Sequence, residues 1–176
     1  FGSACPSCIE IKRQDSDSEC LICRDGVSSP LGPSNLHRAY GDALTFGGDV
    51  LLHQTNCRST SAEGFADDLF NKFPVANIYK KRRCGEHKAG DFVLQEIDLD
   101  SCPWRFIAHA FGQDRVGRNI ERGLRPRWFE SALLKICSRV LELFTSEGKT
   151  EQPRVVLPGY IGCGLSGGDP DVYYKI

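Results

Sequence analysis

Short apolar runs alternate along the chain with stretches in which apolar residues recur every three or four positions. Residues 49–55, 104–111 and 154–158 are compact apolar runs, and each predicts a strand. Residues 91–98 alternate apolar and polar side chains, which is typical of a strand with one buried face. The chain therefore supplies at least four strands for one sheet.

Two stretches have the spacing of a helix with one apolar face. Residues 64–73 place Phe65, Leu69 and Phe73 four positions apart, on one side of a predicted helix. Residues 125–148 carry a longer pattern of the same kind. Its apolar stripe consists of Phe129, Leu133, Ile136, Val140 and Leu143. Strands that alternate with helices predict an α/β domain with a mixed or mostly parallel sheet.

Two polar segments run from a predicted strand toward a helix or the chain end. Residues 53–66 read "HQTNCRSTSAEGFA", and residues 157–171 read "LPGYIGCGLSGGDPD", with five glycines. Ligands of open α/β sheets bind beyond the carboxyl ends of the strands. Backbone N–H groups freed by glycine turns or by a helix N-terminus favour an anion such as phosphate there. The alternative is that the glycines form simple tight turns, because neither common phosphate-loop spacing is present.

Composition narrows the class of protein. The chain has 176 residues, of which 40% are hydrophobic and 26% charged, as in soluble globular proteins. The net charge of -1 excludes a global basic field that would attract nucleic acid or membranes. No apolar run is long enough to span a bilayer, so no membrane partner is expected. The scattered cysteines of the main domain favour reduced thiols and an intracellular protein, cytoplasmic or nuclear.

The first 26 residues contain a separate cysteine motif. Cys5, Cys8, Cys20 and Cys23 form two C-x2-C pairs, the pattern of a structural zinc site. The polar residues between the pairs cannot build a core, so a metal ion would have to fold this module. Two disulfides, a redox dithiol or an incidental pattern are the alternatives. Residues 27–35, rich in Gly, Pro and Ser, are expected to be a linker to a domain at 36–176.

Five segments resemble macrodomains in their order and spacing, and the resemblance covers residues 36–176. The segments are "YGDAL" (40–44), "LLHQTNC" (51–57), "GFADDLFNKFP" (64–74) with Tyr79 after it, "FIAHAFGQ" (106–113) and "IGCGLSGGD" (161–169). The branch that the chain looks most like processes ADP-ribose 1''-phosphate. The resemblance implies a three-layer α/β/α fold that binds ADP-ribose and continues beyond Ile176 through a helix and a strand.

The resemblance also implies a set of ligand-binding residues. Asp42, with Ala43 beside it, matches the acidic residue that accepts a hydrogen bond from the adenine amino group. Asn56 matches the asparagine near the distal ribose. The two phosphate-facing loops match Gly64, Phe65 and Ala66 in the first, and Gly159, Ile161, Gly162, Cys163, Gly164, Leu165, Ser166, Gly167 and Gly168 in the second.

Two functions are compatible with these residues. The first is hydrolysis of ADP-ribose 1''-phosphate or of ADP-ribosyl esters, with Asn56 and Asp169 as catalytic residues. The second is a reader that binds ADP-ribose on protein or nucleic acid without turnover. Asp169 could orient a water or simply cap a helix. His53 and His109 are expected to be core or supporting histidines, and Cys163 a small loop residue rather than a nucleophile.

The basic residues at 80–83 and 115–127 have two interpretations as well. They form either a solvated basic face or a surface for a polyanionic partner, to which the zinc module could add a protein or nucleic-acid contact.

Overall fold

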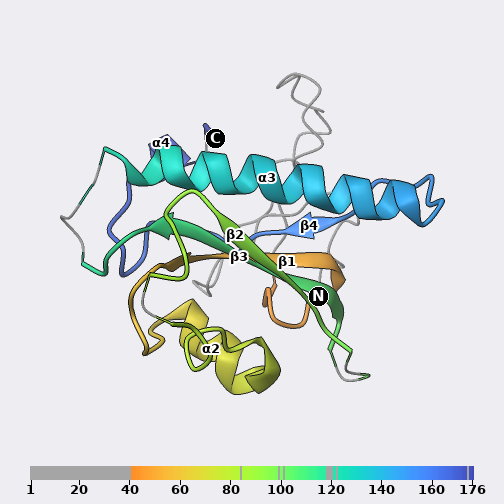
Figure 1. Ribbon diagram of the computed structural model, residues 1–176, viewed down its shortest axis with the longest axis horizontal. Helices are drawn as coiled ribbons and strands as arrows, with labels where there is room; N and C mark the ends of the chain where they lie inside the picture. The colour runs from red at the N-terminus through yellow and green to blue at the C-terminus, as the bar shows by residue number, and fades with distance from the viewer. Residues whose placement is uncertain are drawn as a thin grey trace, which may run out of the picture.

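The computed structural model describes residues 41–83, 85–98, 100, 102–117, 121, 123–173 and 175–176. Its four strands form one sheet in the order β2-β3-β1-β4 (Figure 1). The strands are β1 (Gly48–Asn56), β2 (Phe92–Glu96), β3 (Trp104–Gln113) and β4 (Val155–Val156). β3 and β4 both pair with β1 in parallel, and β2 pairs with β3 antiparallel. The predicted mixed sheet is therefore confirmed.

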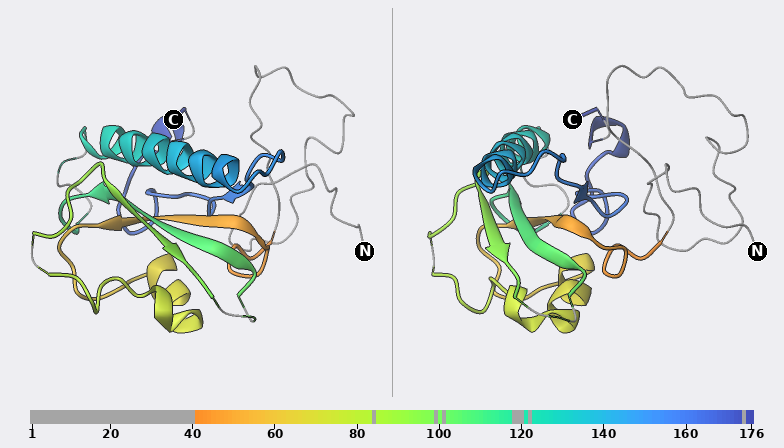
Figure 2. Two further views of the ribbon diagram at one scale, coloured as in Figure 1. Left: turned by 45° about the vertical axis from the view of Figure 1, so that its right-hand side comes forward. Right: turned by 90° about the vertical axis from the view of Figure 1, so that its right-hand side faces the viewer.

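Helices cover both faces of this sheet (Figures 1 and 2). One face carries α2 (Phe65–Lys72), followed by the short 3-10 helix η1 (Pro74–Ala76). The other carries the long α3 (Arg125–Ser146) and the one-turn α4 (Pro170–Tyr173). The described residues thus form three layers, helix, sheet and helix, as the resemblance implies.

Alternation along the strands divides the core in two. In β1, Leu51 faces α2 while Val50 and Leu52 face α3, and all three side chains are fully buried. In β3, Ile107 joins the α2 side and Ala108 the α3 side. Successive residues of a strand point to opposite faces, so a strand buried on both sides is apolar throughout. This is why β1 and β3 appear in the sequence as continuous apolar runs.

The predicted helices are confirmed with small differences at their ends. α3 buries Phe129, Ile136 and Val140 of the predicted stripe, while Leu133 and Leu143 are only partly buried. The helix ends before Gly148, whose φ of 70° suits the left-handed position after a helix.

The strand predicted at residues 154–158 is shorter than expected. β4 keeps only two residues, which pair with Val50 and Leu51 of β1. Pro153 and Pro158 flank it and have no N–H to extend the ladder. The chain therefore leaves the sheet early and enters the glycine-rich segment.

Cys5, Cys8, Cys20, Cys23 and the linker lie outside the described residues. Within the described ranges, no group of three or more metal-binding side chains is close enough to hold an ion. No described helix is long and apolar enough to cross a membrane.

Candidate ligand-binding cleft

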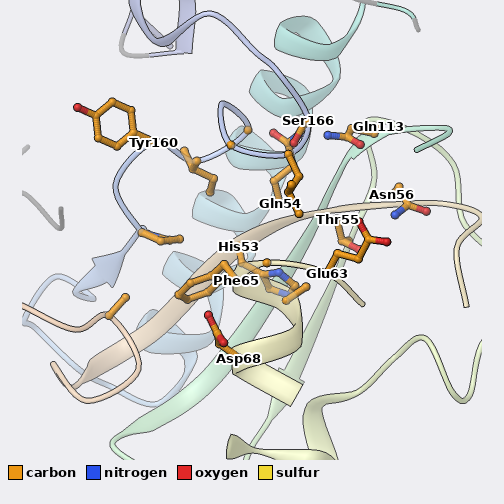
Figure 3. A pocket seen from close by; sticks show the side chains of 18 of the residues that line it. His53, Gln54, Thr55, Asn56, Glu63, Phe65, Asp68, Gln113, Tyr160 and Ser166 are labelled. Atoms are coloured by element: carbon orange, nitrogen blue, oxygen red, sulfur yellow. The ribbon is translucent and has the colours of Figure 1, made fainter. Parts of the chain in front are cut away.

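A large cleft of about 1780 Å³ lies at the carboxyl ends of β1 and β4. Two segments form its walls: residues 57–66, which we call the first loop, and residues 157–169, the second loop. Figure 3 shows Asn56 and Gln113 toward one end, Tyr160 toward the other, and Ser166 between them. The cleft thus occupies the place that the strand order predicts for a ligand.

The first loop presents the N-terminus of α2 to the cleft. Gly64 precedes the helix with a φ of 60°, and no side chain caps the helix start. The first helical bonds use the N–H groups of Asp67 and Asp68, both donated to the Gly64 carbonyl. In the described structure the N–H groups of Phe65 and Ala66, which line the cleft, therefore make no hydrogen bond to protein. Such a helix start attracts an anion.

The second loop presents a further set of backbone donors. Its internal bonds use the N–H groups of Cys163, Gly167 and Gly168. Among the described residues, no bond uses the N–H groups of Gly164, Leu165 and Ser166, which all line the cleft. These three positions can donate to a ligand. The predicted anion site is therefore compatible with the backbone of both loops.

The glycines of the second loop have two different roles. A Cβ at Gly162 would lie 2.3 Å from Cε1 of Tyr173, and one at Gly168 would lie 2.7 Å from Cε2 of the same ring. A Cβ at Gly164 would meet no atom within 4 Å. Tyr173 thus approaches two of these glycines from behind, whereas Gly164 faces open space. From the sequence, an approaching ligand or tight turns were considered for these glycines, and the Tyr173 ring was not predicted.

Asn56 is held in place by several groups. Its Oδ1 accepts hydrogen bonds from the N–H groups of Arg58 at 2.9 Å and Ser59 at 2.7 Å. Its Nδ2 donates to the Tyr79 hydroxyl at 3.3 Å, and its carbonyl accepts a bond from Arg82. The side chain lines the cleft in this fixed orientation. Its position near the end of β1 makes it suitable to contact a ligand without reorganisation.

Asn56 is the last residue of β1, where the pairing with β3 becomes irregular. Thr55 pairs with Phe111, but Asn56 pairs with Gln113, so one residue of β3 is left over between them. Strict alternation would turn Asn56 toward the α3 side, with Leu52. The extra residue belongs to β3 and inserts nothing into β1, so Asn56 leaves the alternation at the end of its own strand. The amide instead reaches Tyr79, which belongs to the core on the α2 side.

Tyr79 and Arg82 form the support behind this amide. The Tyr79 hydroxyl bonds to the Thr55 hydroxyl, and the Arg82 guanidinium lies 4.3 Å from the centre of the Tyr79 ring. Burial raises the pKa of Tyr79, so the phenol is neutral at physiological pH. Arg82, from the basic segment 80–83, is therefore half-buried and structural rather than part of a solvated face.

Two histidines lie under the floor of the cleft. His53 Nε2 and His109 Nδ1 are 2.7 Å apart, and both rings are fully buried. Burial lowers the pKa of His53 to about 4 and the pKa of His109 well below its ordinary value. Both rings are neutral at physiological pH, which fits the expectation that they are core or supporting histidines.

Asp42 and Ala43 lie at another part of the cleft wall. Asp42 Oδ1 accepts the N–H of Leu44 at 2.9 Å, and Oδ2 lies 3.4 Å from the Thr45 hydroxyl. The residue is exposed. A carboxylate oxygen accepts more than one hydrogen bond, so Asp42 retains acceptor capacity toward a ligand.

Several predicted site residues do not line the cleft. These are Cys163, Gly167, Gly168 and Asp169. Asp169 Oδ1 accepts the N–H of Asp171 at 3.0 Å, and its carbonyl accepts from Val172 and Tyr173, so it caps α4. Burial raises the pKa of Cys163 to about 11, so its thiol is protonated and a poor nucleophile. The cap interpretation of Asp169 agrees with these hydrogen bonds, and its catalytic role stays a prediction.

Several residues that line the cleft were not among the predicted site residues. Gln54, Glu63, Tyr79, Gln113 and Tyr160 all line the cleft. Glu63 directly precedes Gly64, a predicted ligand-binding residue, so its position in the sequence could have indicated that it lines the cleft. Gln113 and Tyr79 could not be placed, because their contact with the cleft depends on how β3 and the segment after η1 pack.

Several solved structures have a fold similar to that of this chain. No protein-family model and no curated protein matches the sequence. Among solved structures, the Mycobacterium tuberculosis DarG macrodomain has 16% identity and a TM-score of 0.57, covering 77% of this chain and 82% of that one. The Thermus aquaticus DarG macrodomain has 20% identity and a TM-score of 0.54, covering 77% and 83%.

A third similar structure is Thermosipho africanus DarTG in complex with ADP-ribose. It has 20% identity and a TM-score of 0.52, covering 73% of this chain and 34% of that one. At these identities the TM-scores, all above 0.5, show a shared fold and nothing more. The described part of this chain therefore has the macrodomain fold that the sequence resemblance implies.

Proposed function

We propose that the cleft binds ADP-ribose, with the diphosphate between the two loops. The observation that carries this proposal is the presence of unused backbone N–H groups on both sides of one cleft, at the start of α2 and at Gly164 to Ser166. Donors of this kind favour a bridging anionic group. The ADP-ribose bound to T. africanus DarTG supports the same ligand.

The polar side chains suggest an orientation for the ligand. Asp42 would accept the adenine amino group, next to Ala43 in the cleft wall. Asn56, fixed by Tyr79 and Arg82, would contact the distal ribose. This arrangement spreads the ligand across the ends of the strands.

Hydrolysis at the distal ribose is a second candidate function, and one observation favours it. Glu63 lines the cleft, and Figure 3 shows it at the same end as Asn56. A carboxylate there can accept a proton from an attacking water, as general bases do. Attack of this water would break the bond between the 1''-oxygen and phosphorus, or the ADP-ribosyl ester bond. The leaving ribose oxygen takes a proton, and the products are ADP-ribose and inorganic phosphate or a free carboxylic acid. Asp169 is the other carboxylate proposed for this role, although it caps α4 and is not among the residues that line the cleft.

A reader function is the alternative to turnover. A reader would need the same loops but no base, and binding alone does not distinguish the two. The four cysteines of the N-terminal segment have the spacing of a structural zinc site, and we include one zinc ion in the proposal. That module would contact the macromolecule that carries the ADP-ribose.

Calorimetry with ADP-ribose tests binding, and Gly164→Glu is the variant of choice. A Cβ at Gly164 has open space, so the fold should tolerate the change, while the added carboxylate repels the diphosphate. We expect wild type to bind and Gly164→Glu to lose detectable binding. Normal binding by Gly164→Glu would refute the placement of the diphosphate.

Incubation with ADP-ribose 1''-phosphate and an ADP-ribosylated ester substrate tests turnover. Glu63→Gln removes the proposed base with little change of shape. Release of ADP-ribose by wild type but not by Glu63→Gln would support hydrolysis. Binding without release by wild type would favour the reader, and equal release by both proteins would exclude Glu63 as the base.

A further inference from the structure

Arg125 is a charged side chain inside the protein, directly behind the cleft. It is the first residue of α3, and only 2% of it is exposed. Burying a guanidinium is costly unless its N–H groups find acceptors. Its acceptors in the structure include three backbone carbonyls. In the sequence, Arg125 belongs to the basic segment 115–127, which was expected to be a solvated face or a surface for a polyanionic partner, and its burial shows that this was wrong for Arg125.

The carbonyls come from two separate walls of the cleft. Nη1 of Arg125 donates to the Ser166 carbonyl in the second loop at 2.7 Å. Nη2 donates to the carbonyls of Arg115, at 3.3 Å, and of Gly117. Residues 115–117 follow β3, and both Ser166 and Gly117 line the cleft. One guanidinium therefore joins two segments that are far apart in sequence.

The charge of Arg125 matters because the cleft itself carries little positive charge. Its described lining residues include three carboxylates, on Asp42, Glu63 and Asp68, and a single ammonium, on Lys72. A diphosphate between the loops would rely on backbone N–H groups. A fixed cation behind the second loop makes the local potential more favourable for an anion.

We propose that Arg125 is a positioning residue for diphosphate binding, which holds the second loop and residues 115–117 in register with each other. This inference rests on the proposed function. Arg125 acts through the backbone of the loop, because its hydrogen bonds go to main-chain carbonyls, that of Ser166 among them. Arginine suits the role because its planar fork serves several acceptors at once, whereas a lysine ammonium is a point charge on a flexible stem.

The test compares Arg125→Lys with wild type and with Arg127→Lys, the same change at an exposed position of the same helix turn. Calorimetry measures ADP-ribose binding, and ligand-detected NMR measures adenosine, which lacks the diphosphate. For Arg125→Lys we expect the affinity for ADP-ribose to fall at least about tenfold, and that for adenosine to change less than about twofold. Arg127→Lys should change neither.

Amide hydrogen exchange gives a readout that needs no ligand. In Arg125→Lys the peptides that contain residues 159–168 and 114–117 should both exchange faster, while those of β1 should be unchanged. Unchanged exchange in both segments would overturn the inference, as would equal losses of affinity for the two ligands. If wild type binds no ADP-ribose, the proposed function fails, and the exchange experiment alone decides whether Arg125 joins the two segments.

Discussion

Gly162 and Gly164 of the second loop have different surroundings, so replacing each by alanine should affect the stability of the fold differently. Gly162 has a φ of 72°, and a Cβ there would lie 2.3 Å from Tyr173 Cε1 and 2.6 Å from Gln54 Oε1. Gly164 has no atom within 4 Å of the same position and no positive φ. Gly162→Ala should therefore destabilise the fold, and Gly164→Ala should not.

The expected cost of Gly162→Ala has three parts. Left-handed backbone costs a non-glycine residue about 1–2 kcal/mol. Forcing a methyl against the buried Tyr173 ring costs about 1–3 kcal/mol, as overpacking does elsewhere. Alanine recovers about 0.4–1 kcal/mol because it restricts the unfolded chain. The sum is a loss of about 3 kcal/mol in the free energy of unfolding, or a decrease of roughly 6–12 °C in Tm. Gly164→Ala should be neutral or slightly stabilising.

Urea unfolding of both variants measures these differences, and a double-mutant cycle identifies the cause. If the Tyr173 ring produces the overpacking, Gly162→Ala should cost about 1–3 kcal/mol less in a Tyr173→Ala background. Equal costs in the two backgrounds would show that the ring is not the source. Equal stability of Gly162→Ala and Gly164→Ala would refute the division of the glycines altogether.

Three further predictions concern other parts of the chain. Asp42→Ala should weaken ADP-ribose binding about tenfold or more in calorimetry, because a charge-assisted hydrogen bond is worth about 1.5–3 kcal/mol. Unchanged affinity would show that Asp42 does not bind the adenine. His53 and His109 have lowered pKa values and stay neutral in the fold, so the unfolded chain binds more protons between pH 6.5 and about 4. The free energy of unfolding should therefore fall as the pH decreases through this range. Denaturation at a series of pH values checks this, and a flat profile would contradict it. Metal analysis should find one zinc per chain, lost when Cys5 or Cys20 becomes Ser, whereas a metal-free protein with two disulfides would exclude the site.

Local patterns predicted the elements well because they depend on neighbours along the chain. The apolar runs of β1 and β3 and the stripe of α3 follow from burial on one or both faces, which any sheet with helices on both sides requires. The ends of these strands also indicate where a ligand would bind. Gly164 could be assigned to the cleft in this way, whereas Asp42, which precedes β1, was assigned only through the resemblance to macrodomains.

Other features depend on contacts between residues that are distant in sequence. Asn56, at the end of β1, reaches Tyr79, although alternation alone turns it the other way. This contact depends on how the end of β1 packs against the segment after η1, and the sequence of one strand does not contain it. The hydrogen bonds by which Asp169 caps α4 also had to come from the structure. An aspartate suits a helix cap and a water-orienting role equally, so its residue type does not distinguish them.

The sequence by itself determined the α/β class, the order of strands and helices, and the two loops at the carboxyl ends of the sheet, because hydrophobic periodicity and backbone chemistry are local. Only the tertiary structure decided that Tyr173 fills the space behind Gly162 and that Arg125 joins Ser166 to Gly117. Those contacts bring together segments that are separated by up to about 50 residues along the chain. Their partners are selected by shape and by the need to satisfy buried polar groups, which no periodicity records.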